Sequence, residues 1–171
     1  MGGIFMLCKD ALLQVIQRQT EGLMYHDEMT DYYAFLHLDV LKKLHHKQTK
    51  EELSALRELK CDYIKTFESL PYYIANDPKV IPVEWKNRSS SDVDETSLKI
   101  LIKNSLEEYL NWEKETCEIY KRMAQVFKDN MHFYLYRKMC DFIEEVQEEI
   151  YKVQNLMVDA ASYDYCPSYF K

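Results

Sequence analysis

Residues that break helices are almost missing from most of this chain. Its 171 residues include three glycines and four prolines. Pro71, Pro78 and Pro82 fall in one segment, and all three glycines lie within the first 22 residues. Proline removes a helical N–H donor and clashes with the preceding turn, so the regions around this segment are free to form long helices. The distribution predicts an all-α fold that is interrupted near the prolines.

Two stretches after this interruption carry apolar side chains at helical spacing. The first runs from about Ser97 to Asn130 and the second from about Met131 to Met157. At roughly 100° per residue, the apolar positions of each stretch lie along one line. Glu113 lies at the edge of the first apolar line, and Glu149 lies at the edge of the second. Position 131 is midway between them, so an antiparallel pair of helices places both carboxylates at the same height.

Two further helices are expected before the prolines. The first spans about Asp10 to Lys47, with a bend or break near Gly22. The second begins at Thr49, because Thr49 and Glu52 have the spacing of a capping box. This second helix ends at Pro71 or shortly after it. The connection between these two helices is therefore predicted to be a short turn near Gln48.

The connection between the second and third helices is long. It covers about 24 residues, from Pro71 to Asp94. Fully extended, it spans roughly 80 Å, whereas a helix of 25 residues is only about 37 Å long. We therefore expect a single four-helix domain over residues 1–171, built from two hairpins joined by a long crossover. Its core covers about residues 10–157, and an aromatic tail over 159–171 packs across the outside.

Charge and composition exclude several classes of function. The net charge of −7 disfavours binding to a phosphate backbone, so no nucleic-acid partner is expected. No apolar run is long enough to cross a membrane, and no signal peptide is recognisable. Five cysteines without a CxxC pair indicate neither a zinc knuckle nor a redox pair. Free thiols favour a cytoplasmic location.

Two segments and the helix order resemble the ferritin-like superfamily. Asn111-Trp112-Glu113-Lys114-Glu115 is similar to the third-helix segment of that family, in which a metal-bound Glu sits in an apolar repeat. Cys140-Asp141-Phe142-Ile143-Glu144 is similar to the start of its fourth helix, with Glu149 at a ligand position. The resemblance implies a carboxylate-held metal that reacts with oxygen or peroxide, which is oxidoreductase chemistry.

The chain departs from the ligand pattern of that family. The family has a Glu on the first helix, Glu-x-x-His on the second, Glu on the third, and Glu or Glu-x-x-His on the fourth. The second helix predicted here contains no histidine, and its Glu58 lies roughly 150° from the apolar line. The resemblance therefore implies a reduced or degenerate metal site.

Three interpretations of the two level glutamates remain open. In the first, Glu113, Glu149 and His37, together with Asp27 or His26, bind one iron, manganese or zinc ion. In the second, Lys60 occupies the place of the metal and forms a buried ion pair with one or both glutamates, because buried charges must be paired. The third is a full dimetal centre.

Two functions follow from these interpretations. The first is a ferritin-like protein with a reduced carboxylate metal site, which acts as an oxidoreductase if the site is active. The alternative is a non-enzymatic helical bundle that acts through protein–protein interaction, with the tail from Tyr163 to Phe170 as the contact surface. The sequence assigns no catalytic residue, and it leaves a homo-oligomer open.

Overall fold

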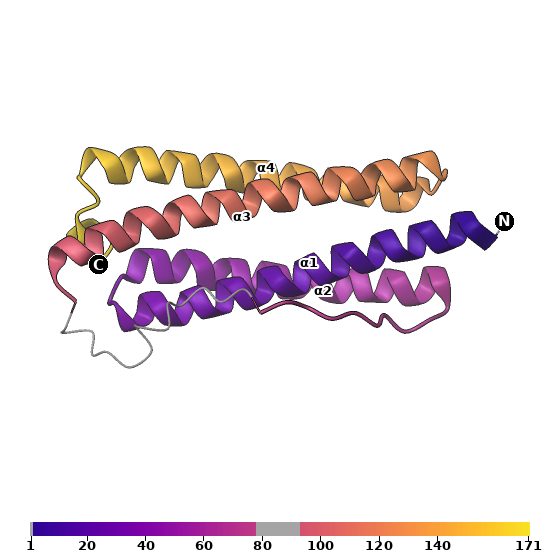
Figure 1. Ribbon diagram of the computed structural model, residues 1–171, viewed down its shortest axis with the longest axis horizontal. Helices are drawn as coiled ribbons and strands as arrows, with labels where there is room; N and C mark the ends of the chain where they lie inside the picture. Colours follow the sequence, from indigo (N-terminus) through magenta and orange to yellow (C-terminus); the bar gives the residue numbers. More distant parts are fainter. Residues whose placement is uncertain (1, 78–92) are drawn as a thin grey trace.

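The fold is an all-α bundle of four long helices, as the sequence predicts. The computed structural model describes residues 2–77 and 93–171, with side chains from Leu7 onward. The helices form two antiparallel hairpins that lie side by side (Figure 1). A short 3-10 helix, η3, follows the fourth helix near the end of the chain. The bounds are α1 Gly2–Phe35, α2 Asp39–Phe67, α3 Glu95–Asp129, α4 Phe133–Ser162 and η3 Pro167–Tyr169.

Each hairpin turns through a residue in the left-handed backbone region. In the α3–α4 turn, Met131 has φ 58°, and the His132 N–H donates to the Phe127 carbonyl at 2.8 Å. In the α1–α2 turn, His37 has φ 57°, and the Leu38 N–H donates to the Tyr33 carbonyl at 3.0 Å. Both turns are Schellman motifs, which usually place glycine at the left-handed position. The predicted reversal near position 131 is confirmed.

The predicted turn near Gln48 is wrong. α1 ends at Phe35 and not at Lys47, and α2 already begins at Asp39. Thr49 therefore lies inside α2, where its hydroxyl donates to the His45 carbonyl at 3.0 Å instead of capping a helix. The turn was missed because His37 takes a conformation that glycine usually marks, and its flanking residues are apolar.

The long connection leaves the end of α2, and its described first part returns along α1. α2 ends at the same end of the bundle as the α3–α4 turn, whereas α3 begins at the opposite end (Figure 1). The described part, residues 68–77, packs on α1. There the Thr20 hydroxyl lies 3.0 Å from the Tyr73 hydroxyl, and the Asn76 N–H donates to Glu21 at 3.0 Å. The predicted crossover prolines Pro78 and Pro82 lie outside the described residues.

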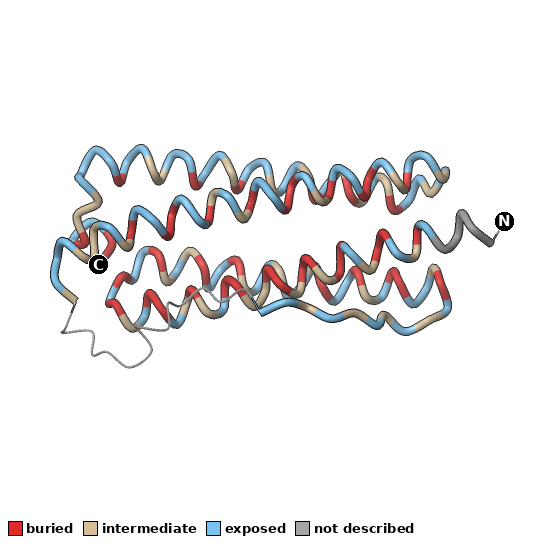
Figure 2. The backbone as a smooth tube through the Cα atoms, viewed as in Figure 1, coloured by how far each residue is buried: buried red, intermediate tan, exposed pale blue. Residues whose placement is uncertain are grey.

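Buried residues recur along the described parts of the helices, on the sides that face neighbouring helices (Figure 2). They form two apolar clusters, one toward each end of the bundle. The first contains Leu12, Leu59, Phe127 and Met139, and the second contains Tyr33, Leu41, Ile102, Val153 and Phe170. Most of the buried polar side chains come from helix positions between these clusters. The candidate site is in this central region.

The expectation that the aromatic tail packs across the outside is wrong for Phe170, which belongs to the core. The Phe170 side chain is fully buried, and its carbonyl accepts a hydrogen bond from the Val40 N–H at 3.0 Å. That N–H belongs to the first turn of α2, which has no partner within its own helix. Tyr163 stacks on Tyr169 with ring centroids 4.9 Å apart. Among the described helices, none combines the length and apolar content needed to cross a membrane.

Candidate functional site

The structure brings Glu113 and Glu149 to one cleft in the middle of the bundle. Glu113 on α3 is 5% exposed and Glu149 on α4 is 6% exposed. Both line a cleft of about 430 Å³ that opens between α2 and α4. α1 and α3 pack directly against each other on the other side of the bundle. The cleft is therefore the open side of the junction between the two hairpins.

Both carboxylate oxygens of Glu149 have hydrogen-bonding partners. The Tyr109 hydroxyl donates to Oε1 at 2.8 Å, and the Lys152 ammonium donates to Oε2 at 3.3 Å. Burial, and then the charges of Glu113 and Glu149, raise the pKa of the Tyr109 phenol well above its ordinary value. Tyr109 therefore keeps its proton and acts as a donor to Glu149.

Two buried histidines stand beside Glu113. The Nδ1 atoms of His26 on α1 and His45 on α2 are 2.9 Å apart, so one of them donates a hydrogen bond to the other. Both side chains are fully buried. The His26 Nε2 atom lies 3.6 Å from Glu113 Oε1 and has no hydrogen-bond partner among the described residues. This nitrogen is an available ligand atom in the neutral tautomer in which the His26 Nδ1–H donates to His45.

Glu52 on α2 adds a third carboxylate to the cleft. Gln19 on α1 holds it through hydrogen bonds to its carboxylate and to its backbone carbonyl, and Tyr120 in turn donates to the Gln19 side chain at 2.5 Å. The carboxylate has room because Gly22 lies opposite; a Cβ at Gly22 would be 3.3 Å from Glu52 Oε2. Burial, and next the charge of Glu113, raise the pKa of Glu52 well above its ordinary value.

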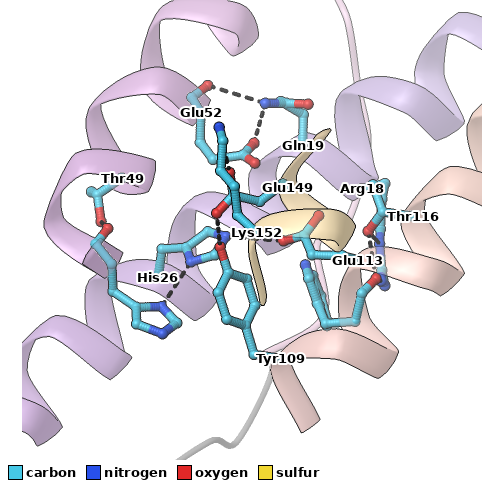
Figure 3. A network of polar contacts seen from close by, with 12 residues as sticks. Arg18, Gln19, His26, Thr49, Glu52, Tyr109, Glu113, Thr116, Glu149 and Lys152 are labelled. Atoms are coloured by element: carbon cyan, nitrogen blue, oxygen red, sulfur yellow. Dashed lines mark hydrogen bonds and ion pairs between the residues drawn. The ribbon is translucent and has the colours of Figure 1, made fainter. Parts of the chain in front are cut away.

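The three central carboxylates and the His26 imidazole come from four different helices. Figure 3 shows His26 of α1, Glu52 of α2, Glu113 of α3 and Glu149 of α4 gathered around the same region, with Lys152 among them. We call His26, Glu52, Glu113 and Glu149 the central donor set. Antiparallel packing with turns at positions 37 and 131 puts these side chains at similar heights in the bundle.

The cleft is strongly acidic. Its described lining includes seven glutamates and one lysine, Lys152. The rim residue Glu145 has a raised pKa, caused first by burial and then by the nearby charges of Asp141, Glu51, Glu148 and Glu58. Such mutual repulsion favours the binding of a cation. The lining glutamates are Glu51, Glu52, Glu58, Glu113, Glu145, Glu148 and Glu149.

Arg18 is a fixed positive charge behind the cleft. Its guanidinium stacks on the Trp112 ring, 3.5 Å from the centroid. It also donates to the Thr116 hydroxyl and to the Trp112 carbonyl, both at 2.9 Å. An ion pair with Glu115 at 3.7 Å adds to these contacts. Because stacking and hydrogen bonds hold the guanidinium in place, Arg18 does not compete for the central carboxylates.

The structure does not place His37, Asp27 or Lys60 beside the two glutamates. His37 is exposed in the α1–α2 turn, and Asp27 is exposed on α1. Lys60 extends over the Tyr73 ring, 5.3 Å from its centroid, and so it does not form the expected ion pair with the glutamates. The expectations for His37 and Lys60 depended on the wrong turn between α1 and α2, whereas Asp27 was expected because it lies within the apolar arc of the first helix. With the turn at His37, Glu52 lies at the height in the bundle where Lys60 was expected, close to that of Glu113 and Glu149.

Sequence reasoning noted His26 as an alternative ligand but missed His45 and Glu52. Glu52 lies on the apolar line of the second helix, but it was explained as part of a capping box and was not considered as a ligand. One signal was present in the sequence: position 37 lies midway between Gly22 and Glu52. A turn at that position brings the glycine opposite the acid.

A dimetal centre does not fit these residues. The fourth position of a Glu-x-x-His pattern is Ala55 after Glu52 and Lys152 after Glu149. Within the described ranges, no three His, Cys, Asp or Glu side chains already stand as a group that holds a metal ion. For one small divalent cation, the central donor set has suitable chemistry: three carboxylates and one imidazole nitrogen. Glu149 joins such a set only after Lys152 leaves it.

No protein-family model, curated protein or solved structure matches this chain. The four-helix bundle is compatible with a ferritin-like fold, but a fold of this kind does not by itself define a function.

Proposed function

We propose that the protein binds one divalent metal ion (iron, manganese or zinc) in the cleft between α2 and α4. The ligands are the carboxylates of Glu52, Glu113 and Glu149 and the Nε2 atom of His26. This is a reduced form of the carboxylate site of ferritin-like bundles, with one ligand from each helix. In this proposal His26 and Glu52 replace the predicted ligands His37 and Asp27.

One observation carries this proposal: the His26 Nε2 atom is fully buried, has no hydrogen-bond partner among the described residues, and lies 3.6 Å from Glu113 Oε1. An unpaired buried polar atom costs free energy, and such atoms cluster where a ligand completes the site. The nearby carboxylates supply the negative charge that a divalent ion requires. Their mutual repulsion also decreases when such an ion binds.

The protein's own residues perform three tasks in this proposal. Gln19 orients Glu52, Tyr109 orients Glu149, and His45 fixes the ring of His26 through the contact between their Nδ1 atoms. Outer-shell contacts of this kind set the orientation and basicity of metal ligands. Bound iron or manganese would supply redox chemistry with oxygen or peroxide, which is the chemistry of an oxidoreductase, whereas bound zinc would not.

Metal analysis tests the proposal directly. Protein produced separately in medium supplemented with iron, manganese or zinc is passed through a desalting column, and metal per chain is measured by elemental analysis. We expect at least one of the three metals to be retained near one ion per chain. Glu113→Gln and Glu149→Gln should each weaken binding by at least about tenfold, the loss typical even of outer-shell partners.

Glu144→Gln is the matched control, because Glu144 is an exposed carboxylate on α4 that is not among the residues lining the cleft. This variant should retain metal like the wild type. The proposal is overturned if the wild-type protein is metal-free after all three supplements and excess Mn²⁺ or Zn²⁺ leaves its melting temperature unchanged. A bound ion stabilises the folded state by mass action, so real binding raises that temperature.

A further inference from the structure

Lys152 is placed to compete with a bound cation. It follows Glu149 by three residues on α4, and its ammonium nitrogen is 3.3 Å from Glu149 Oε2. The other oxygen of Glu149 is already held by the Tyr109 hydroxyl at 2.8 Å. Both oxygens of this carboxylate are therefore engaged, and the one on the Lys152 side is engaged by a positive charge.

The contacts of Lys152 make it displaceable. Its side chain is 55% exposed, whereas that of Glu149 is 8% exposed. Lysine carries a compact charge on a flexible four-carbon stem, so the ammonium can swing outward without movement of the helix. Glu148 lies four residues before it on the same helix and also lines the cleft. It offers a second carboxylate nearer to the solvent.

Arg18 is held by more contacts than Lys152 is, and this difference supports the inference that Lys152 can be displaced. The other cation near the site is held by stacking on Trp112 and by hydrogen bonds to Thr116 and to a backbone carbonyl. Lys152 has no stacking contact of this kind among the interactions that the structure shows, and its contact with Glu149 is to a single oxygen. The Arg18 guanidinium is therefore held in place, whereas the Lys152 ammonium is able to move away from Glu149.

We propose that Lys152 is a built-in competing cation: its ammonium occupies Glu149 when the cleft is empty and must be displaced before a metal ion binds there. Lys152 is then a residue that sets the metal affinity of the site without being a ligand. This inference depends on the proposed function for its biological meaning. It also states, separately, that the ion pair with Lys152 keeps Glu149 from joining the other carboxylates as a ligand while the cleft is empty.

The test compares Lys152→Met with the wild type in calorimetric titrations with Mn²⁺ and with Zn²⁺. Methionine keeps an unbranched side chain of similar length and removes the charge. We expect the metal affinity to rise by roughly tenfold, since a neighbouring charge of like sign is lost. Lys103→Met is the matched control: it removes one positive charge from an exposed position on α3, and we expect its affinity to stay within about threefold of the wild type.

Melting temperatures supply a second readout that separates competition from a structural role. Lys152→Met should lower the melting temperature of the metal-free protein, because Glu149 loses its counter-charge. It should raise the shift that saturating Mn²⁺ or Zn²⁺ produces. A lysine that only supports the fold would lower the melting temperature and leave this shift unchanged.

The outcomes distinguish the two proposals. If the wild type binds metal and Lys152→Met binds it no more tightly than Lys103→Met does, the inference about Lys152 is overturned and the proposed function stands. If only Lys152→Met binds metal, the inference stands, and the proposed function fails for the natural chain. If neither protein binds metal, both proposals are overturned.

Discussion

The buried imidazole pair shows how single residues make stability depend on pH. Burial, and next the neighbouring His26, lower the pKa of His45 well below its ordinary value. The Tyr25, Tyr33 and Tyr109 rings pack around His45 and leave it little access to water. His45 is therefore neutral in the folded protein near neutral pH. In the unfolded chain it takes up a proton once the pH falls below about 6.5.

This difference has a defined sign. Below about pH 6.5 the unfolded state binds one more proton at His45 than the folded state does, so the free energy of unfolding decreases as the pH falls. Glu52 has the opposite effect, because its raised pKa makes the folded state bind more protons as the pH falls. His45→Gln removes only the first contribution. We expect a weaker loss of stability between pH 7 and pH 5 in His45→Gln than in the wild type, measured by urea unfolding.

The control for this experiment is His46→Gln, which changes the neighbouring exposed histidine of the same helix. It should reproduce the wild-type pH dependence. Equal slopes for His45→Gln and the wild type would show that His45 is not buried in its neutral form.

The heights of the site residues could be predicted only for the hairpin whose turn could be predicted. The α3–α4 turn follows from two apolar stripes of similar length, and it gives the common height of Glu113 and Glu149. The heights assigned to His37 and Lys60 depended on a turn placed about eleven residues too late, at Gln48 instead of His37. That shift puts His37 in the turn itself and brings Glu52 into the cleft.

At the scale of elements, the turn between α1 and α2 is formed by a histidine in the left-handed region. His37 has φ 57° and is exposed, while its neighbours Leu36 and Leu38 are buried. The two leucines explain why the region reads as continuous helix, since the apolar pattern does not stop there. No glycine marks the turn, and the capping-box spacing of Thr49 and Glu52 gives a false start eleven residues later.

Substitution of His37 tests this turn. A β-branched residue is strained in the left-handed region, at a cost of roughly 1–2 kcal/mol. We expect His37→Ile to lower the free energy of unfolding by about 1 kcal/mol, measured by urea unfolding. His46→Ile, on the exposed face of α2, should change it by less than about 0.5 kcal/mol. An equal effect of both substitutions would argue against a turn at His37.

The same variant separates the two candidate ligand sets. His37 is remote from the cleft lining, so His37→Ile should retain as much metal as the wild type after desalting. Loss of metal in this variant, with the control unaffected, would return His37 to the ligand set.

At the scale of the whole molecule, the tail ties the second hairpin to the first. The tail returns from α4 to the start of α2, where the Phe170 carbonyl accepts a hydrogen bond from the Val40 N–H. Its aromatic ring is fully buried in the second apolar cluster. The sequence identified the tail as aromatic but left its role open between packing and contact with a partner.

Truncation of the tail ring distinguishes these roles. Phe170→Ala leaves a cavity in the core, and we expect a loss of about 3 kcal/mol or more in the free energy of unfolding. Tyr163→Ala is the control, because Tyr163 is 57% exposed, and we expect it to lose less than about 1 kcal/mol. The comparison is made by urea unfolding. A negligible effect of Phe170→Ala would show that the tail does not belong to the core.

Gly22 lies in the middle of α1, where a glycine weakens a helix by about 1 kcal/mol relative to alanine. This glycine stands at the level where the Glu52 carboxylate packs against α1. A Cβ at Gly22 would lie 3.3 Å from Glu52 Oε2. A methyl group there would make the end of the Glu52 side chain shift by a few tenths of an ångström. The close approach of this acid to α1 is therefore a consequence of an atom that the opposite helix lacks.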